Sequence, residues 1–343
     1  MISLILHIGT HKTGTTVFQR TIWENRKALN IIDNIVVINI FEFIKRKDLE
    51  FTKTYNNQIV EDLKSFLEKK IKNKSKRYII SWEGFSGDPF NLYNNVEVVS
   101  KIIKDATINY NTSIVLCLRR QDDFIQSIYM QAKHENVNGI KINELLSKID
   151  LLDWNRFIER FIYYFGSNKV QVLPYDRVIF DKKSIIQLLG IEIGSNFLKV
   201  FKKVPIKNVG FSKNALEIFD NLSKKINIEQ RKVLRDLLQE VSNKGAFREY
   251  NIIDENTKLK IVEQFKMSNS VISKKYWYEK FGMENFSTPE FQPSEQLPKI
   301  DDIYLNIILS ALSKIEISNN LARESTYHRF VKKLKNRFRN TFL

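Results

Sequence analysis

A short loop near the amino terminus has residue types that suit an anion. Gly9 and Gly14 lie five positions apart and allow a tight turn, after which a helical pattern begins. Backbone N–H groups in such a turn point at a phosphate bound at the helix N-terminus. The side chains that can add charge or hydrogen bonds are those of His11, Lys12, Thr13, Thr15 and Thr16. The loop therefore predicts a phosphate-binding site, and the plain alternative is a strand-to-helix turn without a ligand.

The position of the lysine separates this loop from that of the nucleoside triphosphatases. Their pattern, G-x-x-x-x-G-K-[ST], has Lys directly after the second glycine, where this chain has Thr15. Here the lysine lies inside the loop, as Lys12. The departure argues against ordinary Mg-ATP chemistry, although Lys12 can still neutralise a charged oxygen.

A second motif lies far along the chain from this loop. Residues 6–19 read LHIGTHKTGTTVFQ, and the apolar run 113–118 is followed by Arg119, with Ser127 eight residues later. Together these segments resemble the 5′-phosphosulfate loop and the 3′-phosphate motif of the sulfotransferases that use 3′-phosphoadenosine 5′-phosphosulfate (PAPS). A guanidinium can hold two oxygens of a phosphate dianion while a hydroxyl donates a further bond. Alone, each could be an ordinary surface residue, but their order after the loop favours a donor site.

The resemblance covers about residues 1–285 and implies a role for each matched residue. The donor PAPS, and its product 3′-phosphoadenosine 5′-phosphate (PAP), would be bound by Lys12, Thr13, Gly14, Thr15, Thr16, Arg119 and Ser127. Lys12 would also stabilise the charge on the leaving phosphate. No metal is required by this chemistry.

Two side chains compete for the role of catalytic base. Glu83 follows the apolar run 78–81 and is expected at the carboxyl edge of the sheet, where open α/β proteins assemble their sites. A carboxylate there can take the acceptor's hydroxyl proton. The segment Ser81-Trp82-Glu83 also resembles a Ser-x-Glu segment of carbohydrate sulfotransferases. His11 is the alternative, because imidazole titrates near neutrality.

The elements that must position these residues can be read from the apolar pattern. Short apolar runs predict five strands, at 3–8, 35–40, 78–81, 113–118 and 170–173. Helical patterns lie between or after them, near 15–29, 57–73, 92–105, 121–135 and 153–165. The alternation predicts an α/β fold: a mostly parallel central sheet of about five strands flanked by helices. The resemblance implies that this is the P-loop-like sulfotransferase fold.

The second half of the chain is predicted to be helical. Helical patterns appear at 182–189, 212–225, 228–242, 255–278 and 302–315. We expect a cap from about residue 181 that belongs to a single α/β domain, 1–317, followed by a basic amphipathic tail, 318–343. Within 323–343, seven Lys or Arg accompany an apolar stripe at every fourth residue. Such a helix can lie on an anionic membrane or pack back on the protein.

Composition limits the class of protein. With 55 Lys or Arg against 39 Asp or Glu, the net charge of +16 attracts anionic partners. A hydrophobic content of 43% excludes wholesale disorder, and the single cysteine, Cys117, excludes an internal disulfide framework. The start of the chain lacks the three-part pattern of a signal peptide, and no apolar run approaches the roughly 20 residues of a membrane span. We expect a cytoplasmic protein; if the basic tail lies on the membrane and does not pack back on the protein, it adds peripheral contact at the inner face.

These observations favour a bacterial PAPS-dependent sulfotransferase. The acceptor would be a hydroxyl of a saccharide, polysaccharide or glycolipid, with Glu83 as base. The first alternative is a P-loop kinase or another nucleotide-binding enzyme, which would need Mg²⁺ and a lysine in the usual place. The second is a non-enzymatic nucleic-acid-binding protein, suggested by the net charge and the basic tail; with no recognised motif, we expect no specific nucleic acid partner.

Overall fold

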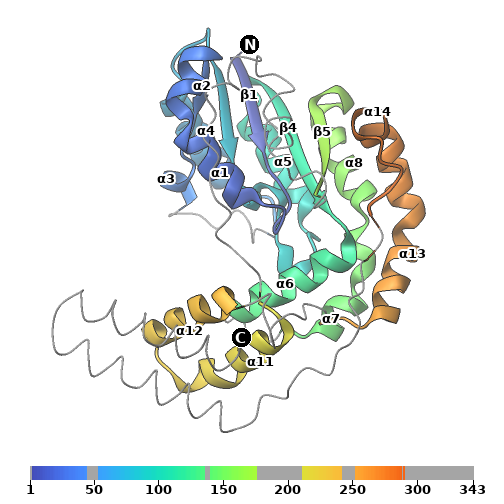
Figure 1. Cartoon of the computed structure of the whole chain (residues 1–343). Coiled ribbons are helices and arrows are strands. Elements are labelled where there is room, and N and C mark those ends of the chain that lie inside the picture. Colours follow the sequence, from blue (N-terminus) through green and yellow to red (C-terminus); the bar gives the residue numbers. More distant parts are fainter. Residues whose placement is uncertain are drawn as a thin grey trace, which may run out of the picture. The chain divides into compact units, whose positions relative to one another are not determined.

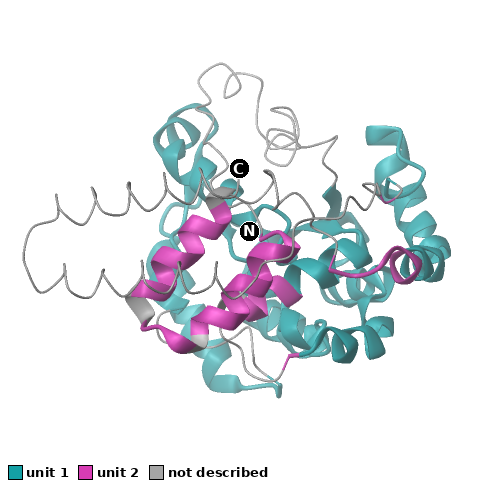
Figure 2. Ribbon diagram, turned by 60° about the horizontal axis from the view of Figure 1, so that its bottom comes forward, with its two compact units in different colours: residues 1–128, 141–205, 259–288 teal, residues 129–140, 206–258, 289–343 magenta. Residues whose placement is uncertain are grey.

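The computed structural model describes residues 2–44, 53–135, 140–175, 211–241, 252–287 and 289. The helices predicted at 182–189 and 302–315, and the tail 318–343, lie outside the described residues. The chain divides into two compact units, which Figure 2 distinguishes by colour: residues 1–128, 141–205 and 259–288, and residues 129–140, 206–258 and 289–343. The predicted limits of a 1–317 domain and its tail stay predictions.

The first unit contains a five-stranded sheet that confirms all five predicted strands. The strands are β1 (Ile2–His7), β2 (Ile35–Val37), β3 (Arg77–Ser81), β4 (Tyr110–Arg119) and β5 (Val170–Tyr175). Their order is β2-β3-β1-β4-β5, and every pair is parallel (Figure 1). The strands are continuous apolar runs because helices cover both faces of a parallel sheet.

Helices surround this sheet as the apolar pattern indicates. In the first half of the chain they are α1 (Thr15–Glu24), α2 (Arg26–Ile32), α3 (Phe41–Ile44), α4 (Asn57–Lys70) and α5 (Val96–Ala106). They are followed by α6 (Gln121–Glu135), α7 (Ile142–Ser147) and α8 (Trp154–Phe165), and later by α13 (Glu255–Ile272) and α14 (Tyr278–Phe281). A π-helical turn, Ser273–Trp277, separates the last two.

Two predicted helices have different limits from those expected. The helix predicted at 15–29 is interrupted at Asn25, whose side-chain amide donates to the Thr21 carbonyl and whose backbone leaves the helical region. The helix predicted from 92 starts at 96, because Leu92 and Tyr93 have left-handed backbone angles, with φ of 51° and 58°. Both differences arise from local backbone conformations that the spacing of apolar residues does not reveal.

Two clusters of the first unit's core lie on the same face of the sheet, where Ile5 of β1 packs against both. One cluster joins Phe18 and Ile22 of α1 to Ile35 and Ile79 of the neighbouring strands. Cys117 is buried with Val115 and Leu173 in another cluster. Burial raises the pKa of the Cys117 thiol to about 12, so Cys117 is a core residue and not a nucleophile.

The described part of the second unit is helical, as expected for this part of the chain. Its helices are α11 (Lys213–Leu222) and α12 (Ile228–Val241). Ser212 caps α11 by accepting a hydrogen bond from the backbone of Ala215, 3.3 Å away. Phe211 and Phe219 are buried in this unit with ring centroids 5.3 Å apart.

The strand order places two loops side by side. The chain passes from β1 to β2 on one side, then from β3 across β1 to β4 on the other, so that β1 and β4 are neighbours. Ligands of open α/β sheets bind outside the carboxyl ends of the strands at such a reversal. The predicted phosphate loop follows β1, and Arg119 ends β4.

Candidate anion-binding site

The loop after β1 has the backbone that an anion cradle needs. Gly9, Lys12 and Gly14 have positive φ angles of 29°, 64° and 76°. Gly14 is the N-cap of α1, and no side chain caps the helix there. The first N–H groups of a helix have no carbonyl partner within it, so this terminus can receive an anion.

The chain itself holds the loop in this shape. The backbone N–H and the hydroxyl of Thr10 both donate to the Cys117 carbonyl, at 3.0 and 2.8 Å. The Thr13 hydroxyl donates to the Thr10 carbonyl at 2.5 Å. Of the predicted hydroxyl donors, Thr13 thus already donates its hydroxyl hydrogen to a carbonyl within the loop. A cradle fixed in advance binds with less loss of conformational entropy.

Thr15 contributes a buried hydroxyl that has no hydrogen-bond partner in the described part of the chain. Its oxygen faces the loop's first glycine, where a Cβ on Gly9 would lie 2.7 Å from it. A buried polar atom without a partner is costly, so a ligand atom is its natural complement. Thr16, in contrast, is exposed.

Arg119 connects the end of β4 to this loop. Its Nη1 donates to the Lys12 carbonyl at 3.2 Å, while the Lys12 side chain is exposed. The guanidinium lies over the Tyr175 ring, 5.3 Å from its centroid. The Nε atom is buried and has no hydrogen-bond partner among the described residues. Arg119 is therefore placed beside the loop with part of its donor capacity unused.

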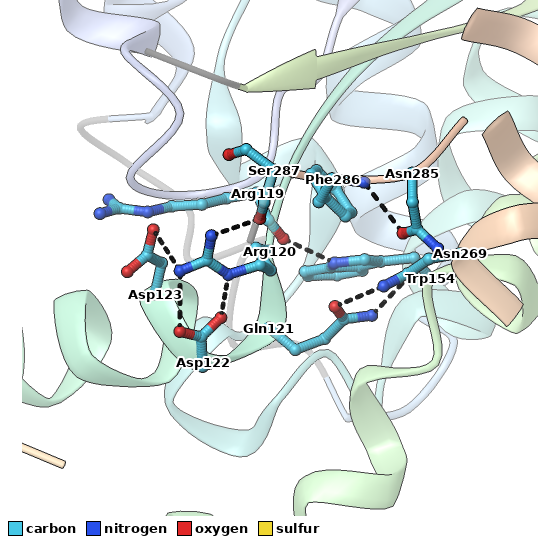
Figure 3. Close-up of polar contacts among 10 residues, drawn as sticks. All are labelled: Arg119, Arg120, Gln121, Asp122, Asp123, Trp154, Asn269, Asn285, Phe286 and Ser287. Atoms are coloured by element: carbon cyan, nitrogen blue, oxygen red, sulfur yellow. Dashed lines mark hydrogen bonds and ion pairs between the residues drawn. The ribbon is translucent and has the colours of Figure 1, made fainter. Parts of the chain in front are cut away.

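The next residue, Arg120, is engaged entirely by the protein. Its Nε and Nη2 bind the two carboxylate oxygens of Asp122 at 2.6 and 3.0 Å, and Nη2 lies 3.5 Å from Asp123. Its Nη1 donates to the Ser287 carbonyl at 2.7 Å (Figure 3). This arginine fixes the start of α6 and is not a candidate ligand-binding group.

Ser127 lies on α6 and is 4% exposed. Ser127 and Arg119 come from adjacent elements, but no hydrogen bond between them is present in the described residues. The sequence-based pairing of Arg119 with Ser127 stays a prediction.

Glu83 follows β3 and is half-buried at the carboxyl edge of the sheet. Gln19, on α1, donates from its amide to the Glu83 carboxylate at 3.3 Å and to the Ser81 carbonyl at 3.1 Å. The Trp82 backbone N–H donates to the His7 carbonyl of β1, 3.0 Å away. Glu83 is thus tied to the helix that the phosphate loop begins.

His11, the alternative base, is buried and bound to Tyr93. The Tyr93 hydroxyl accepts the His11 backbone N–H at 2.8 Å and lies 3.1 Å from the imidazole Nδ1. The His11 side chain is 4% exposed, whereas Glu83 is half-buried. Geometry thus gives Glu83 the better access to an incoming hydroxyl.

A second histidine, His7, lies under the loop. Its Nδ1 is 2.7 Å from the Ser81 hydroxyl, and burial lowers its pKa from 6.5 to about 3. His7 is therefore neutral at physiological pH. It supports the floor of the site, since a Cβ on Gly9 would lie 3.3 Å from its ring.

Several residues that position the site cannot be recognised from the amino-acid sequence. Gln19 orients Glu83, Tyr93 holds His11, and the Trp154 indole N–H donates to the Arg119 carbonyl at 2.7 Å. None has a local signature, because each reaches a partner 35 to 82 residues away. The Tyr175 ring, which also has no such signature, lies against the Arg119 guanidinium.

Comparisons with known proteins add little to this geometry. No family model matches the chain, and no curated protein matches it. Among solved structures, a sulfotransferase from Alicyclobacillus acidocaldarius aligns with 66% of this chain and 93% of its own, at 14% sequence identity and a TM-score of 0.38. At that identity and score, the likeness assigns no activity to this chain.

Two further findings concern the described residues only. The described residues contain no group of three or more His, Cys, Asp or Glu side chains arranged to hold a metal ion. None of their helices combines the length and apolar character that a membrane crossing needs.

Proposed function

We propose that this protein is a PAPS-dependent sulfotransferase that transfers a sulfuryl group to a hydroxyl of a saccharide, polysaccharide or glycolipid. The observation that carries the proposal is the hydrogen bond from Arg119 to the Lys12 carbonyl. It brings two anion-binding elements together, the helix N-terminus after β1 and the arginine that ends β4. A nucleoside with phosphates on both its 3′ and 5′ positions is a ligand that uses both.

The residues present fit such a donor. At the loop, the first N–H groups of α1, the Thr15 hydroxyl and Lys12 would hold the 5′-phosphosulfate, with Thr13, Gly14 and Thr16 completing the cradle. At the other end, the guanidinium of Arg119 would bind the 3′-phosphate, joined by Ser127. The partnerless Thr15 hydroxyl and Arg119 Nε support this assignment, because both are buried donors without a partner among the described residues.

In the proposed reaction, Glu83 removes the proton from the acceptor hydroxyl as its oxygen bonds to sulfur. Gln19 keeps the carboxylate oriented through its 3.3 Å hydrogen bond. The bond from sulfur to the 5′-phosphate oxygen breaks, and charge develops on that oxygen. Lys12 and the N–H groups of α1 stabilise that charge, and PAP is the second product. His11 is the alternative base.

The location of the enzyme in the cell bears on which acceptors it can reach. We propose that the basic segment 323–343 holds the enzyme on the inner face of an anionic membrane, near lipid-linked or surface glycans. The expected result is that deleting residues 320–343 abolishes binding to anionic liposomes. Failure of the intact chain to bind them would contradict this part of the proposal.

The activity is tested by following PAP release from PAPS in the presence of pooled saccharides. We expect Glu83→Gln to lower kcat by about 10² to 10⁴-fold while leaving PAP affinity nearly unchanged. His11→Asn is the matched variant for the alternative base. Turnover of Mg-ATP in place of PAPS would overturn the proposal in favour of a kinase. A kcat loss confined to His11→Asn would move the base to that residue.

A further inference from the structure

Four aromatic rings form a buried cluster behind the site. They are Tyr93, Phe124, Trp154 and Phe157, and each is at most 4% exposed. Tyr93 has its ring centroid 5.6 Å from Phe124, 6.1 Å from Trp154 and 5.2 Å from Phe157. Phe124 and Trp154 meet edge to face at 5.4 Å. Interlocking rings of this kind have few alternative packings, so the cluster is a rigid body.

The two polar atoms of this cluster contact opposite ends of the proposed donor site. The Tyr93 hydroxyl accepts the backbone N–H of His11, in the phosphate loop. The Trp154 indole donates to the carbonyl of Arg119, at the end of β4. One rigid group of side chains therefore contacts both anion-binding elements.

Tyr93 is held for this contact at a cost in backbone energy. Leu92 and Tyr93 are consecutive residues with positive φ, a strained conformation that residues with a Cβ rarely adopt. Hydrogen bonds fix them there: the Tyr93 N–H donates to the Asp88 carbonyl at 2.8 Å, and the Val96 N–H donates to the Tyr93 carbonyl at 3.0 Å. This strained backbone conformation places the Tyr93 hydroxyl within hydrogen-bond distance of His11.

We propose that Tyr93 and Trp154 are positioning residues that set the distance between the loop and Arg119. Tyr93 fixes the loop through His11, whose neighbour Lys12 is itself in a left-handed conformation. Trp154 fixes the backbone from which the Arg119 side chain extends. The spacing of the two ends then selects a nucleoside 3′,5′-bisphosphate over a monophosphate. The choice of ligand rests on the proposed function, whereas the holding of the loop does not.

The roles of Tyr93 and Trp154 can be distinguished, because each variant is expected to weaken binding at a different end of the ligand. Calorimetric titrations of 5′-AMP, 3′-AMP and PAP are made with wild type, Tyr93→Phe and Trp154→Phe. Tyr93→Phe keeps the ring and removes the hydroxyl, so 5′-AMP affinity is expected to fall about tenfold with 3′-AMP unchanged. Trp154→Phe is expected to show the reverse. Equal losses for both ligands in both variants would overturn the proposal in favour of general destabilisation.

Hydrogen exchange tests the positioning role without any ligand. In wild type the His11 amide is hydrogen-bonded and buried, so a peptide spanning the loop is expected to exchange slowly. Tyr93→Phe is expected to speed exchange there, and Trp154→Phe is not. Tyr163→Phe, at an 81% exposed tyrosine, is the matched control. Unchanged loop exchange in Tyr93→Phe would overturn the proposal, whereas faster exchange without nucleotide binding by wild type would contradict only the proposed function.

Discussion

Two adjacent arginines at the end of β4 have opposite surroundings. The guanidinium of Arg120 is enclosed by Asp122, Asp123 and the Ser287 carbonyl. That of Arg119 makes one hydrogen bond to a carbonyl of the phosphate loop and keeps a buried Nε without a partner within the described residues. The two arginines carry the same charge, so their charge does not distinguish their roles. Arg120 is therefore a structural residue, whereas Arg119 keeps donor capacity that we propose an anion uses.

A similar contrast exists beneath the loop. His7 is paired with the Ser81 hydroxyl at 2.7 Å. Thr15, whose side chain like that of His7 lies against Gly9, has a buried hydroxyl that no described residue contacts by a hydrogen bond. Groups that the chain satisfies should therefore affect unfolding, and groups that it does not satisfy should affect binding.

The largest expected effect is the dependence of stability on pH at His7. Because burial lowers its pKa from 6.5 to about 3, the unfolded chain binds a proton between these values that the folded protein does not. Its contribution to stability is therefore lost as the pH falls from about 6.5 toward 3, by about 5 kcal/mol in full. Urea unfolding from pH 7 to 4 is compared in wild type and His7→Gln. Parallel curves would contradict this account.

Arg120→Ala should destabilise the fold by about 3 to 5 kcal/mol, because it leaves the fully buried Asp122 carboxylate without its partner. The measurement is the free energy of unfolding in urea. The matched control, Arg120→Met with Asp122→Leu, removes both charges and should recover most of the loss. A change below about 1 kcal/mol in Arg120→Ala would show that this arginine is not structural.

Arg119→Lys should act on binding instead. Lysine keeps the positive charge but loses the planar fork that holds two phosphate oxygens, so PAP affinity is expected to fall about tenfold. Because Arg119 is half-buried and contacts only a carbonyl and a ring among the described residues, unfolding should change by less than about 1 kcal/mol. If stability falls and affinity does not, the contrast between the two arginines fails.

Thr15→Val gives the smallest expected effect. Valine has nearly the same shape and removes a hydroxyl that lacks a partner in the described structure. Stability should stay constant or rise by about 1 kcal/mol, while PAP affinity falls about fivefold. Thermal unfolding and calorimetry measure the two. Loss of stability would mean that the hydroxyl has a structural role.

Local patterns in the sequence are sufficient to predict most of the fold. Buried parallel strands must be apolar, so the runs that form β1 to β5 stand out in the amino-acid sequence. The strand order does not, because it depends on hydrogen bonds between distant segments. The left-handed backbone conformation of Leu92 and Tyr93 cannot be predicted for a different reason, because residues with a Cβ rarely adopt it.

A candidate site can be proposed from the sequence as a set of residues, whereas the arrangement of those residues requires the structure. Glycine spacing points to the loop after β1, and a strand-end position points to Glu83. The partners that orient these groups have no such pattern: Gln19 meets Glu83 across 64 residues, and Tyr93 meets His11 across 82. The sequence also does not distinguish Arg119 from Arg120 by chemistry, because their partners lie in other elements.

Calorimetric titration of wild type and Arg119→Ala with PAP tests the central claim most directly, with 5′-AMP and Mg-ATP as comparison ligands. The account predicts that wild type binds PAP far more tightly than 5′-AMP, and that Arg119→Ala loses about 100-fold in PAP affinity with its fold intact. A wild-type protein with no preference for the 3′-phosphate would contradict the assignment of this site to a nucleoside bisphosphate.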